Sequence, residues 1–124
     1  MSSNYDFYKM IVVFLVIAWA IFHFNGRNTE QLKYDNGRPI RTGEVVNNLN
    51  QGVWTWYYEN GKVQIQGSFV NGKREGEWLT FDTLGNVILR SFYKNNLIDG
   101  TQILYDKDGN VMQVNHYKND KMVE

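Results

Sequence analysis

The chain has 124 residues, with 13 Lys and Arg against 13 Asp and Glu, so its formal net charge is zero. This balance provides no basic face to displace counterions, so nucleic acid is not an expected partner. Cys is absent, which excludes disulfides, thiolate nucleophiles and cysteine-ligated metals. Eleven glycines, one proline and an aromatic content of 15% favour short strands joined by tight turns.

The first element in chain order is an uninterrupted apolar run from Met10 to Phe22. Counted from Phe7 to Phe24, with Lys9 snorkelling outward, it gives 18 residues. That is roughly 27 Å of helix, enough for a thin or untilted membrane span. We therefore predict an N-terminal flank and transmembrane helix over residues 1–27, in contact with membrane lipid, in a single-pass protein of the bacterial or mitochondrial inner membrane. The expected membrane-anchor residues are Met10, Phe14, Trp19 and Phe22.

Two other interpretations of this run stay open. A cleaved signal peptide has a similar apolar length, and Ala18-Trp19-Ala20 is a pattern that a signal peptidase can read, although Asp6 lies in the preceding region. A buried core helix is the second alternative, although the remainder of the chain is predicted to be all-β and self-contained. Basic residues after the run favour the cytoplasmic or matrix side for that remainder. The side of the membrane is left open.

From residue 28 onward the sequence repeats every 24 residues, in units covering 28–51, 52–75, 76–99 and 100–123. Columns at this spacing include Gly61, Gly85 and Gly109; Trp54 and Trp78; Tyr57, Phe81 and Tyr105; and Phe69, Tyr93 and Tyr117. Several columns that agree on one period are not explained by chance. We therefore predict that residues 28–124 form one repeat domain.

Each unit carries two turn signals separated by alternating apolar and polar residues. The first signal starts at Asp35, Glu59, Thr83 and Lys107, and the second lies at Asn47-Asn48, Asn71-Gly72, Asn95-Asn96 and Asn119-Asp120. Asn, Asp and Gly accept the positive φ that two-residue hairpin turns require, and a period of two indicates strands. The predicted fold is all-β, an elongated antiparallel meander of four 24-residue β-hairpin repeats in a single twisted sheet, preceded by the N-terminal helix.

The stretch GVWTWYYENGK from Gly52 to Lys62, with the second Asn-Gly pair before Gly76, resembles MORN-repeat variants. Such repeats occur in bacterial antitoxin-like proteins with tandem hairpins. The resemblance spans residues 28–123 and is strongest in the second and third units, whereas Gln102 replaces the tryptophan in the fourth. It implies the meander of hairpins described above. It implies function only loosely, because such repeats serve many roles.

No catalytic, cofactor-binding or metal-binding set emerges from the sequence. The segment Asp106 to Asn110 superficially resembles a calcium loop, but Gly109 would occupy position 4 where an EF-hand needs its glycine at position 6. His116 is interpreted as a surface histidine. The carboxylates near turns are interpreted as solvated charges: Glu75, Glu77, Asp82 and Asp99. We therefore expect no enzyme, no cofactor and no small-molecule substrate.

The aromatic residues are the remaining functional signal. A lone sheet leaves a face open unless something covers it, and an exposed apolar strip marks a contact surface. Some rings are expected to pack over the small residues Gly43, Gly67 and Ser91. The expected partner-binding residues are Trp54, Trp56, Tyr58, Trp78, Phe81 and Tyr105.

These observations favour a non-enzymatic, membrane-anchored protein–protein interaction module. It would be an accessory or scaffold subunit of a membrane protein assembly, whose other protein subunits are its partners. The alternative is an antitoxin or immunity-type protein that neutralises a toxin through the aromatic face of the sheet. Direct binding of lipid head groups has no polybasic segment to support it, and glycan binding by surface rings cannot be ranked above ordinary packing.

Overall fold

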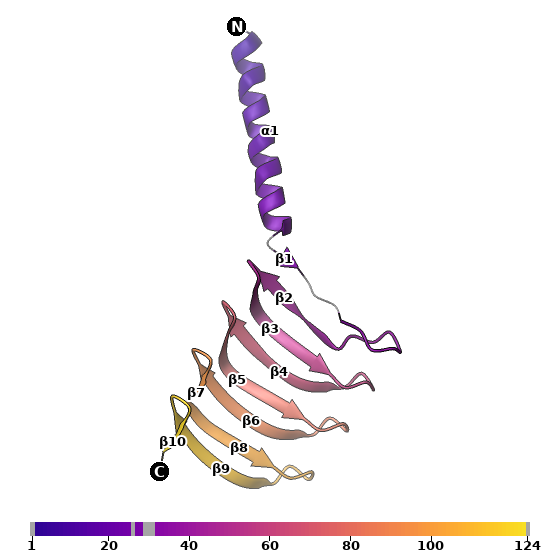
Figure 1. The fold of residues 1–124 in the computed structure, drawn as a ribbon, viewed down its shortest axis with the longest axis vertical. Coiled ribbons are helices and arrows are strands. Elements are labelled where there is room, and N and C mark those ends of the chain that lie inside the picture. Colours follow the sequence, from indigo (N-terminus) through magenta and orange to yellow (C-terminus); the bar gives the residue numbers. More distant parts are fainter. Residues whose placement is uncertain (1, 26, 29–31, 124) are drawn as a thin grey trace.

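The computed structural model describes the backbone of residues 2–25, 27–28 and 32–123, and the side chains of residues 8–20 and 32–123. Within these ranges one helix is followed by ten strands (Figure 1). They are α1 (Ser2–Asn25), β1 (Arg27–Asn28), β2 (Arg41–Val46), β3 (Leu49–Tyr57), β4 (Val63–Val70), β5 (Lys73–Phe81), β6 (Val87–Lys94), β7 (Leu97–Ile98), β8 (Gly100–Tyr105), β9 (Val111–Lys118) and β10 (Lys121–Val123).

The described strands form one antiparallel sheet in the order β1-β2-β3-β4-β5-β6-β8-β9-β10, with β7 paired to β6. Strands that follow one another in the chain are therefore neighbours in the sheet. Figure 1 shows the hairpins stacked along one direction, each strand curved, with the C-terminus at the end of the sheet farthest from α1. The prediction of an antiparallel meander with strands in hairpin order is confirmed.

The helix α1 does not meet the requirements of a membrane span. Among the residues that the structure describes, no helix is both long and apolar enough to cross a bilayer. The prediction of a single-pass protein of the bacterial or mitochondrial inner membrane is therefore wrong.

The assignments that depended on this span are corrected with it. The membrane-anchor role of Met10, Phe14 and Trp19 is withdrawn, and so is the expected lipid contact. All three side chains are exposed, by 58%, 67% and 63% respectively. The fourth predicted anchor residue, Phe22, lies outside the residues whose side chains are described.

The second turn of each unit is a two-residue hairpin turn, as predicted. Both central residues have positive φ, for example 49° at Asn71 and 80° at Gly72, and Val70 pairs with Lys73 across the turn. Positive φ recurs in the other units, at Asn47-Asn48, Asn95-Asn96 and Asn119-Asp120. This is the type I′ geometry, whose twist matches that of the flanking strands.

The first turn of each unit is one residue longer than predicted. The backbone N–H of Tyr58 donates to the carbonyl of Lys62 at 2.8 Å, and the N–H of Gly61 donates to the carbonyl of Tyr58 at 2.9 Å. The loop therefore has three residues, in which a type I turn is followed by Gly61 at φ 88°. The two-residue turn predicted at Asn60-Gly61 is wrong, because only its glycine takes a positive φ. Gly37, Gly85 and Gly109 occupy the same position in the other units.

The contact that packs one hairpin on the next places a tryptophan ring on a glycine. A Cβ atom added to Gly43 would lie 2.1 Å from the Trp54 ring, and one added to Gly67 would lie 2.1 Å from the Trp78 ring. The Nε1–H of Trp54 donates to the carbonyl of Glu44 at 3.1 Å, and that of Trp78 donates to the carbonyl of Ser68 at 3.2 Å. The rings are 1% and 9% exposed. The prediction that rings pack over Gly43 and Gly67 is confirmed.

The same position changes its chemistry in the fourth unit. Gln102 stands in the tryptophan column and Ser91 in the glycine column. The Nε2 of Gln102 donates to the Ser91 hydroxyl at 3.2 Å, and Ser91 is 3% exposed. The smaller Gln side chain leaves room for the serine Cβ, so the two positions change together. The ring predicted over Ser91 is replaced by this hydrogen bond.

We predict that Gly67→Ser and Trp78→Gln compensate one another. Gly67→Ser alone pushes the Trp78 ring aside and should lower the free energy of unfolding by about 1–3 kcal/mol. Trp78→Gln alone removes a buried ring and should cost about 3–5 kcal/mol. The double variant recreates the Ser91–Gln102 pair, so it should be at least ~1 kcal/mol more stable than the sum of the single effects predicts.

Urea unfolding of the four proteins measures this coupling. Ser68→Ala is the control, because it changes the next residue but leaves the carbonyl that accepts from Trp78. Single effects that add to within ~0.5 kcal/mol would show that the ring and the glycine are not coupled.

Two aspartates hold the first turns of the third and fourth units. The Oδ1 of Asp106 accepts from the N–H groups of Asn110 at 2.8 Å and Asp108 at 2.9 Å. Asp82 accepts in the same way from Asn86 and Leu84. The backbone N–H of Asn110 is the main cause that lowers the pKa of the Asp106 carboxyl below 3.8, and the N–H of Asn86 does the same for the pKa of Asp82. These hydrogen bonds favour the ionised carboxylates.

We predict that Asp106→Ala lowers the melting temperature at pH ~7 by a few degrees, and that the difference from the wild type shrinks toward pH ~2.5. The folded pKa lies below the unfolded one, so the stabilisation is complete above pH 3.8 and is lost as the pH falls through the folded value. Thermal melting across this range is the measurement. Asp108→Ala is the control, since it removes a neighbouring carboxylate and leaves the Asp106 acceptor in place; an equal loss in both variants would contradict the prediction.

Candidate partner-binding surface

A continuous row of aromatic rings runs across β3, β4, β5 and β6 on one face of the sheet. We call it the aromatic ladder: Trp54, Trp56, Phe69, Trp78 and Tyr93. Neighbouring centroids lie 5.0–6.3 Å apart, from Trp54–Trp56 at 5.9 Å and Trp56–Phe69 at 6.3 Å to Phe69–Trp78 at 5.0 Å and Trp78–Tyr93 at 5.9 Å. The Phe69–Trp78 and Trp78–Tyr93 pairs are edge-to-face, the favoured arrangement of aromatic pairs.

The strand register explains why these residues meet on one face. Trp54 pairs with Gly67, Trp56 with Ile65 and Gly52 with Phe69 across β3 and β4, and paired residues point to the same side. Gly76 pairs with Tyr93 and Trp78 with Ser91 across β5 and β6. The glycines opposite Phe69 and Tyr93 have positive φ, 74° at Gly52 and 76° at Gly76, and a Cβ atom at either would have no heavy atom within 4 Å.

The rings of the ladder differ in burial. Trp54 and Trp78 are buried, because they lie on Gly43 and Gly67. Trp56, Phe69 and Tyr93 are only half-buried. Trp56 lies between the two buried tryptophans, 5.9 Å from each. The solvent-accessible part of the ladder therefore consists of half-buried rings, which pack against the buried tryptophan rings.

Two arginines flank the ladder at its two ends. The guanidinium carbon of Arg41 lies 5.9 Å from the Trp54 ring centroid, and that of Arg74 lies 4.2 Å from the Tyr93 ring centroid. The Nε of Arg74 also donates to Oδ1 of Asn96 at 2.8 Å, which holds the guanidinium over the ring. The shorter distance at Tyr93 is within the range of a cation–π interaction.

The six predicted partner-binding residues do not all lie on this surface. Trp54, Trp56 and Trp78 belong to the ladder. Tyr58 lies at the first turn, where its hydroxyl donates to the carbonyl of Phe81 at 2.6 Å and links two units. Phe81 pairs with Val87 and Tyr105 with Val111, which places both rings on the opposite face.

Sequence reasoning missed Phe69, Tyr93, Arg41 and Arg74 as members of the surface. The column of Phe69 and Tyr93 was visible at the 24-residue period. Its place beside the tryptophans depends on strand register, which the turn lengths set. The predicted two-residue turn at Asn60-Gly61 would give the same pairing of Gly52 with Phe69 and of Trp54 with Gly67, because the bulge between Trp56 and Tyr57 offsets the extra turn residue. The repeat columns and the predicted turns were therefore sufficient to place Phe69 beside the tryptophans.

The remaining polar groups serve the fold. Glu75 accepts from the N–H of Asn95 at 2.7 Å, and Glu77 lies 3.8 Å from the Arg90 guanidinium. His116 Nδ1 lies 3.5 Å from the Thr101 hydroxyl. In the part of the chain that the structure describes, no three His, Cys, Asp or Glu side chains gather as metal ligands would.

The sequence model of the family described as MORN repeat variant matches residues 50–71, 74–95 and 98–119. No curated protein matches the chain. The resemblance expected over residues 28–123 is therefore shown for three repeats between residues 50 and 119. MORN repeats are generally modules that interact with proteins or membranes, and the family is typically non-enzymatic. Since the matched segments make up more than half of the 124 residues and fold as successive hairpins of one sheet, the chain belongs to the MORN repeat variant family.

Proposed function

We propose that the chain is a non-enzymatic protein–protein interaction module that binds a partner protein with its aromatic ladder. The observation that carries this proposal is the half-buried state of Trp56, Phe69 and Tyr93 on a sheet face that no described element covers. Aromatic rings and arginines are the residue types enriched at protein interfaces and at their energetic centres. Here they occur together, because Arg41 and Arg74 lie over the two end rings.

The rigidity of the ladder supports the same function. Half-buried rings that are fixed by neighbours lose little conformational entropy when a partner covers them. Trp56 is held between the buried Trp54 and Trp78, so it would enter a complex already oriented. This arrangement makes Trp56 the expected centre of the interface.

A protein is a better match for this surface than a lipid bilayer. Residues 28–124 contain 11 Lys and Arg and 12 Asp and Glu, so they carry no net positive charge for anionic head groups. The ladder is an extended row of rings rather than a set of apolar side chains that project from loop tips. We place the module as an accessory subunit of a protein assembly.

Deletion of the gene separates this role from that of a toxin neutraliser. An accessory subunit leaves a viable deletion strain with a smaller or less stable assembly. A lethal deletion that is rescued by removal of a second gene would overturn the accessory role.

We predict that a photoreactive phenylalanine analogue at position 69 cross-links one discrete partner in cells, whereas the analogue at position 57 does not. Phe69 is on the ladder face, and Tyr57 lies on the opposite face, where its hydroxyl is 3.2 Å from that of Thr42. Trp56→Ala should abolish the cross-link and weaken binding of the identified partner at least tenfold, as loss of a central interface residue does. The readouts are gel mobility of the cross-linked product and titration calorimetry.

Tyr57→Ala is the matched control, because it removes an adjacent ring from the other face and should leave the cross-link intact. Melting curves establish that both variants fold. Equal cross-linking from positions 69 and 57, or a cross-link unaffected by Trp56→Ala, would disprove binding through the ladder.

A further inference from the structure

Side chains at the first turns join successive units along one edge of the sheet. The hydroxyls of Tyr34 and Tyr58 donate to the carbonyls of Tyr57 and Phe81 at 2.8 and 2.6 Å. Amides add to these links: Asn36 donates to the carbonyl of Glu59 at 3.0 Å and Asn60 to that of Thr83 at 2.9 Å. The Lys62 ammonium donates to the carbonyl of Leu84 at 3.1 Å. We call the side-chain bonds from the second to the third unit, made by Tyr58, Asn60 and Lys62, the clasp.

The clasp is not repeated between the third and fourth units. Asp82, Leu84 and Asn86 occupy the positions of Tyr58, Asn60 and Lys62. Asp82 accepts hydrogen bonds from its own turn, and Asn86 Nδ2 donates back to Asp82 at 3.1 Å. Leu84 has no polar group and is 73% exposed. All three clasp positions have therefore changed at the same junction.

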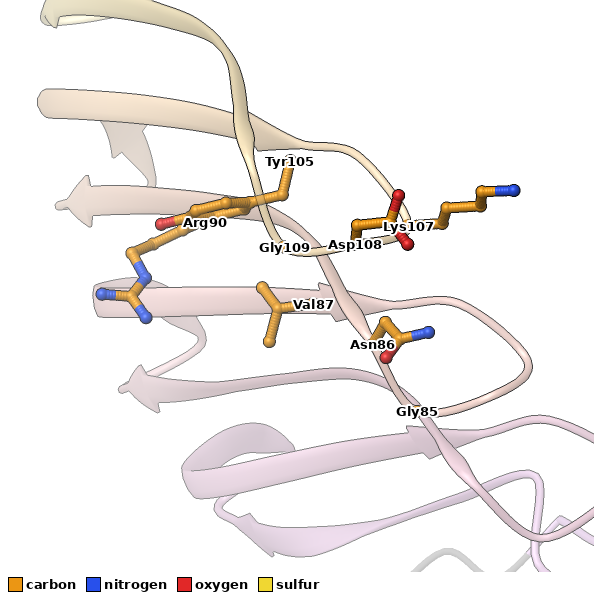
Figure 2. A pocket seen from close by; sticks show the side chains of 8 residues that line it. All are labelled: Gly85, Asn86, Val87, Arg90, Tyr105, Lys107, Asp108 and Gly109. Atoms are coloured by element: carbon orange, nitrogen blue, oxygen red, sulfur yellow. The ribbon is translucent and has the colours of Figure 1, made fainter.

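An open groove of about 390 Å³ lies at this junction. Its lining comes from both units and includes Asn86, Val87, Arg90, Tyr105, Lys107 and Asp108. Figure 2 shows Arg90 and the Tyr105 hydroxyl extending toward one end, with Asn86 and Asp108 at the other and Val87 between them. The groove therefore has the Arg90 guanidinium at one end, and at the other the Asn86 amide, the Asp108 carboxylate and the Lys107 side chain.

The Arg90 guanidinium has more hydrogen-bond donors than the described residues around it have acceptors for. It lies between Leu79 and Ile103 on the neighbouring strands, and neither of these can accept a hydrogen bond. Its Nε is buried and makes no hydrogen bond with the described residues, and its Nη1 lies 3.8 Å from Glu77. The same position in the second unit is satisfied, because Gln66 donates to the Thr55 hydroxyl at 3.0 Å. A buried donor without an acceptor is costly, so a ligand that supplies the acceptor is favoured.

We propose that this groove binds a carboxylate side chain within an extended segment of a protein partner. The carboxylate meets the Arg90 guanidinium, whose side chain is 38% exposed, and a small rotation brings Nε into a two-point contact. The segment then passes over Val87, and its backbone N–H groups donate to the oxygens of Asn86 and Asp108. Arg90 and the ladder residue Trp78 lie on opposite faces, so this site stands independently of the proposed ladder interface.

The repeat itself supplies a variant that closes the groove without weakening the fold. Asp82→Tyr, Leu84→Asn and Asn86→Lys together rebuild the clasp of the preceding junction. This triple variant should melt close to the wild-type temperature, because the hydrogen bonds that it adds between units offset the loss of Asp82 as the acceptor within its own turn. A second variant, Glu77→Gln, removes the carboxylate that competes for Arg90.

The test is a titration of the full chain by NMR with a capped seven-residue peptide that carries one central Glu. The matched peptide has Gln at that position. The Glu peptide should shift the Arg90 Nε–H resonance and the amides of Gly85, Asn86 and Gly109, and the Gln peptide should bind at least ~10-fold more weakly. Arg90→Gln and the triple variant should both lose the response, and Glu77→Gln should strengthen it.

Three results would overturn the proposal. One is equal binding of the Glu and Gln peptides. Another is a response that survives in both Arg90→Gln and the triple variant. The third is an equal response to inorganic phosphate at the same concentration, which would make the groove a general anion site. A missing ladder cross-link would leave all of these measurements unchanged, so the two proposals fail separately.

Discussion

The contact between an indole ring and a glycine on the neighbouring hairpin is the constraint on which the sheet depends. Over the described residues the sheet has no second layer, so apolar groups must be buried in contacts along the sheet itself. Trp54 on Gly43 and Trp78 on Gly67 achieve this, and each indole N–H is satisfied by a backbone carbonyl beside the glycine. Burial of the ring and pairing of its N–H are therefore met by one arrangement. Because each contact joins adjacent units, stability accumulates between nearest neighbours.

The same arrangement produces the surface that we assign to binding. A tryptophan ring that lies on a glycine packs against the backbone of the sheet and is buried. The other rings of the ladder have no glycine beneath them and are covered only by the neighbouring rings. Trp56 and Phe69 are in that position and remain half-buried. Buried rings and half-buried rings thus belong to one row. A substitution in the row affects both stability and binding, which is why controls on the opposite face are needed to separate the two effects.

The sequence allowed much of the fold to be predicted, because the period of 24 residues and the turn residues are local signals. The second turns were identified correctly as two-residue turns, and the small residues Gly43 and Gly67 identified the sites of ring packing. The surface was only partly predictable, because the face of a residue depends on register across several turns. Phe81 lies on the face opposite Trp78 because three residues separate them along β5, and Tyr105 is related in the same way to Gln102 along β8. The membrane span was predicted from an apolar run, and among the described residues no helix is both long and apolar enough to cross a bilayer.

In a repeat protein, the positions that depart from the repeat give the most information about what distinguishes one junction between units from the next. A column that is uniform across units reports what each hairpin needs in order to stack on the next, as the turn glycines do. Where several columns change together at one junction, one set of contacts between the units is replaced by another set.

The change from a Trp–Gly pair to the Gln102–Ser91 pair keeps the junction closed, since a hydrogen bond replaces ring packing. The change from Tyr58, Asn60 and Lys62 to Asp82, Leu84 and Asn86 leaves it open, and an arginine without sufficient acceptors faces the opening. This change keeps the fold but leaves the Arg90 Nε–H without an acceptor, which gives no structural benefit within the described chain. A ligand at that junction provides the missing acceptor.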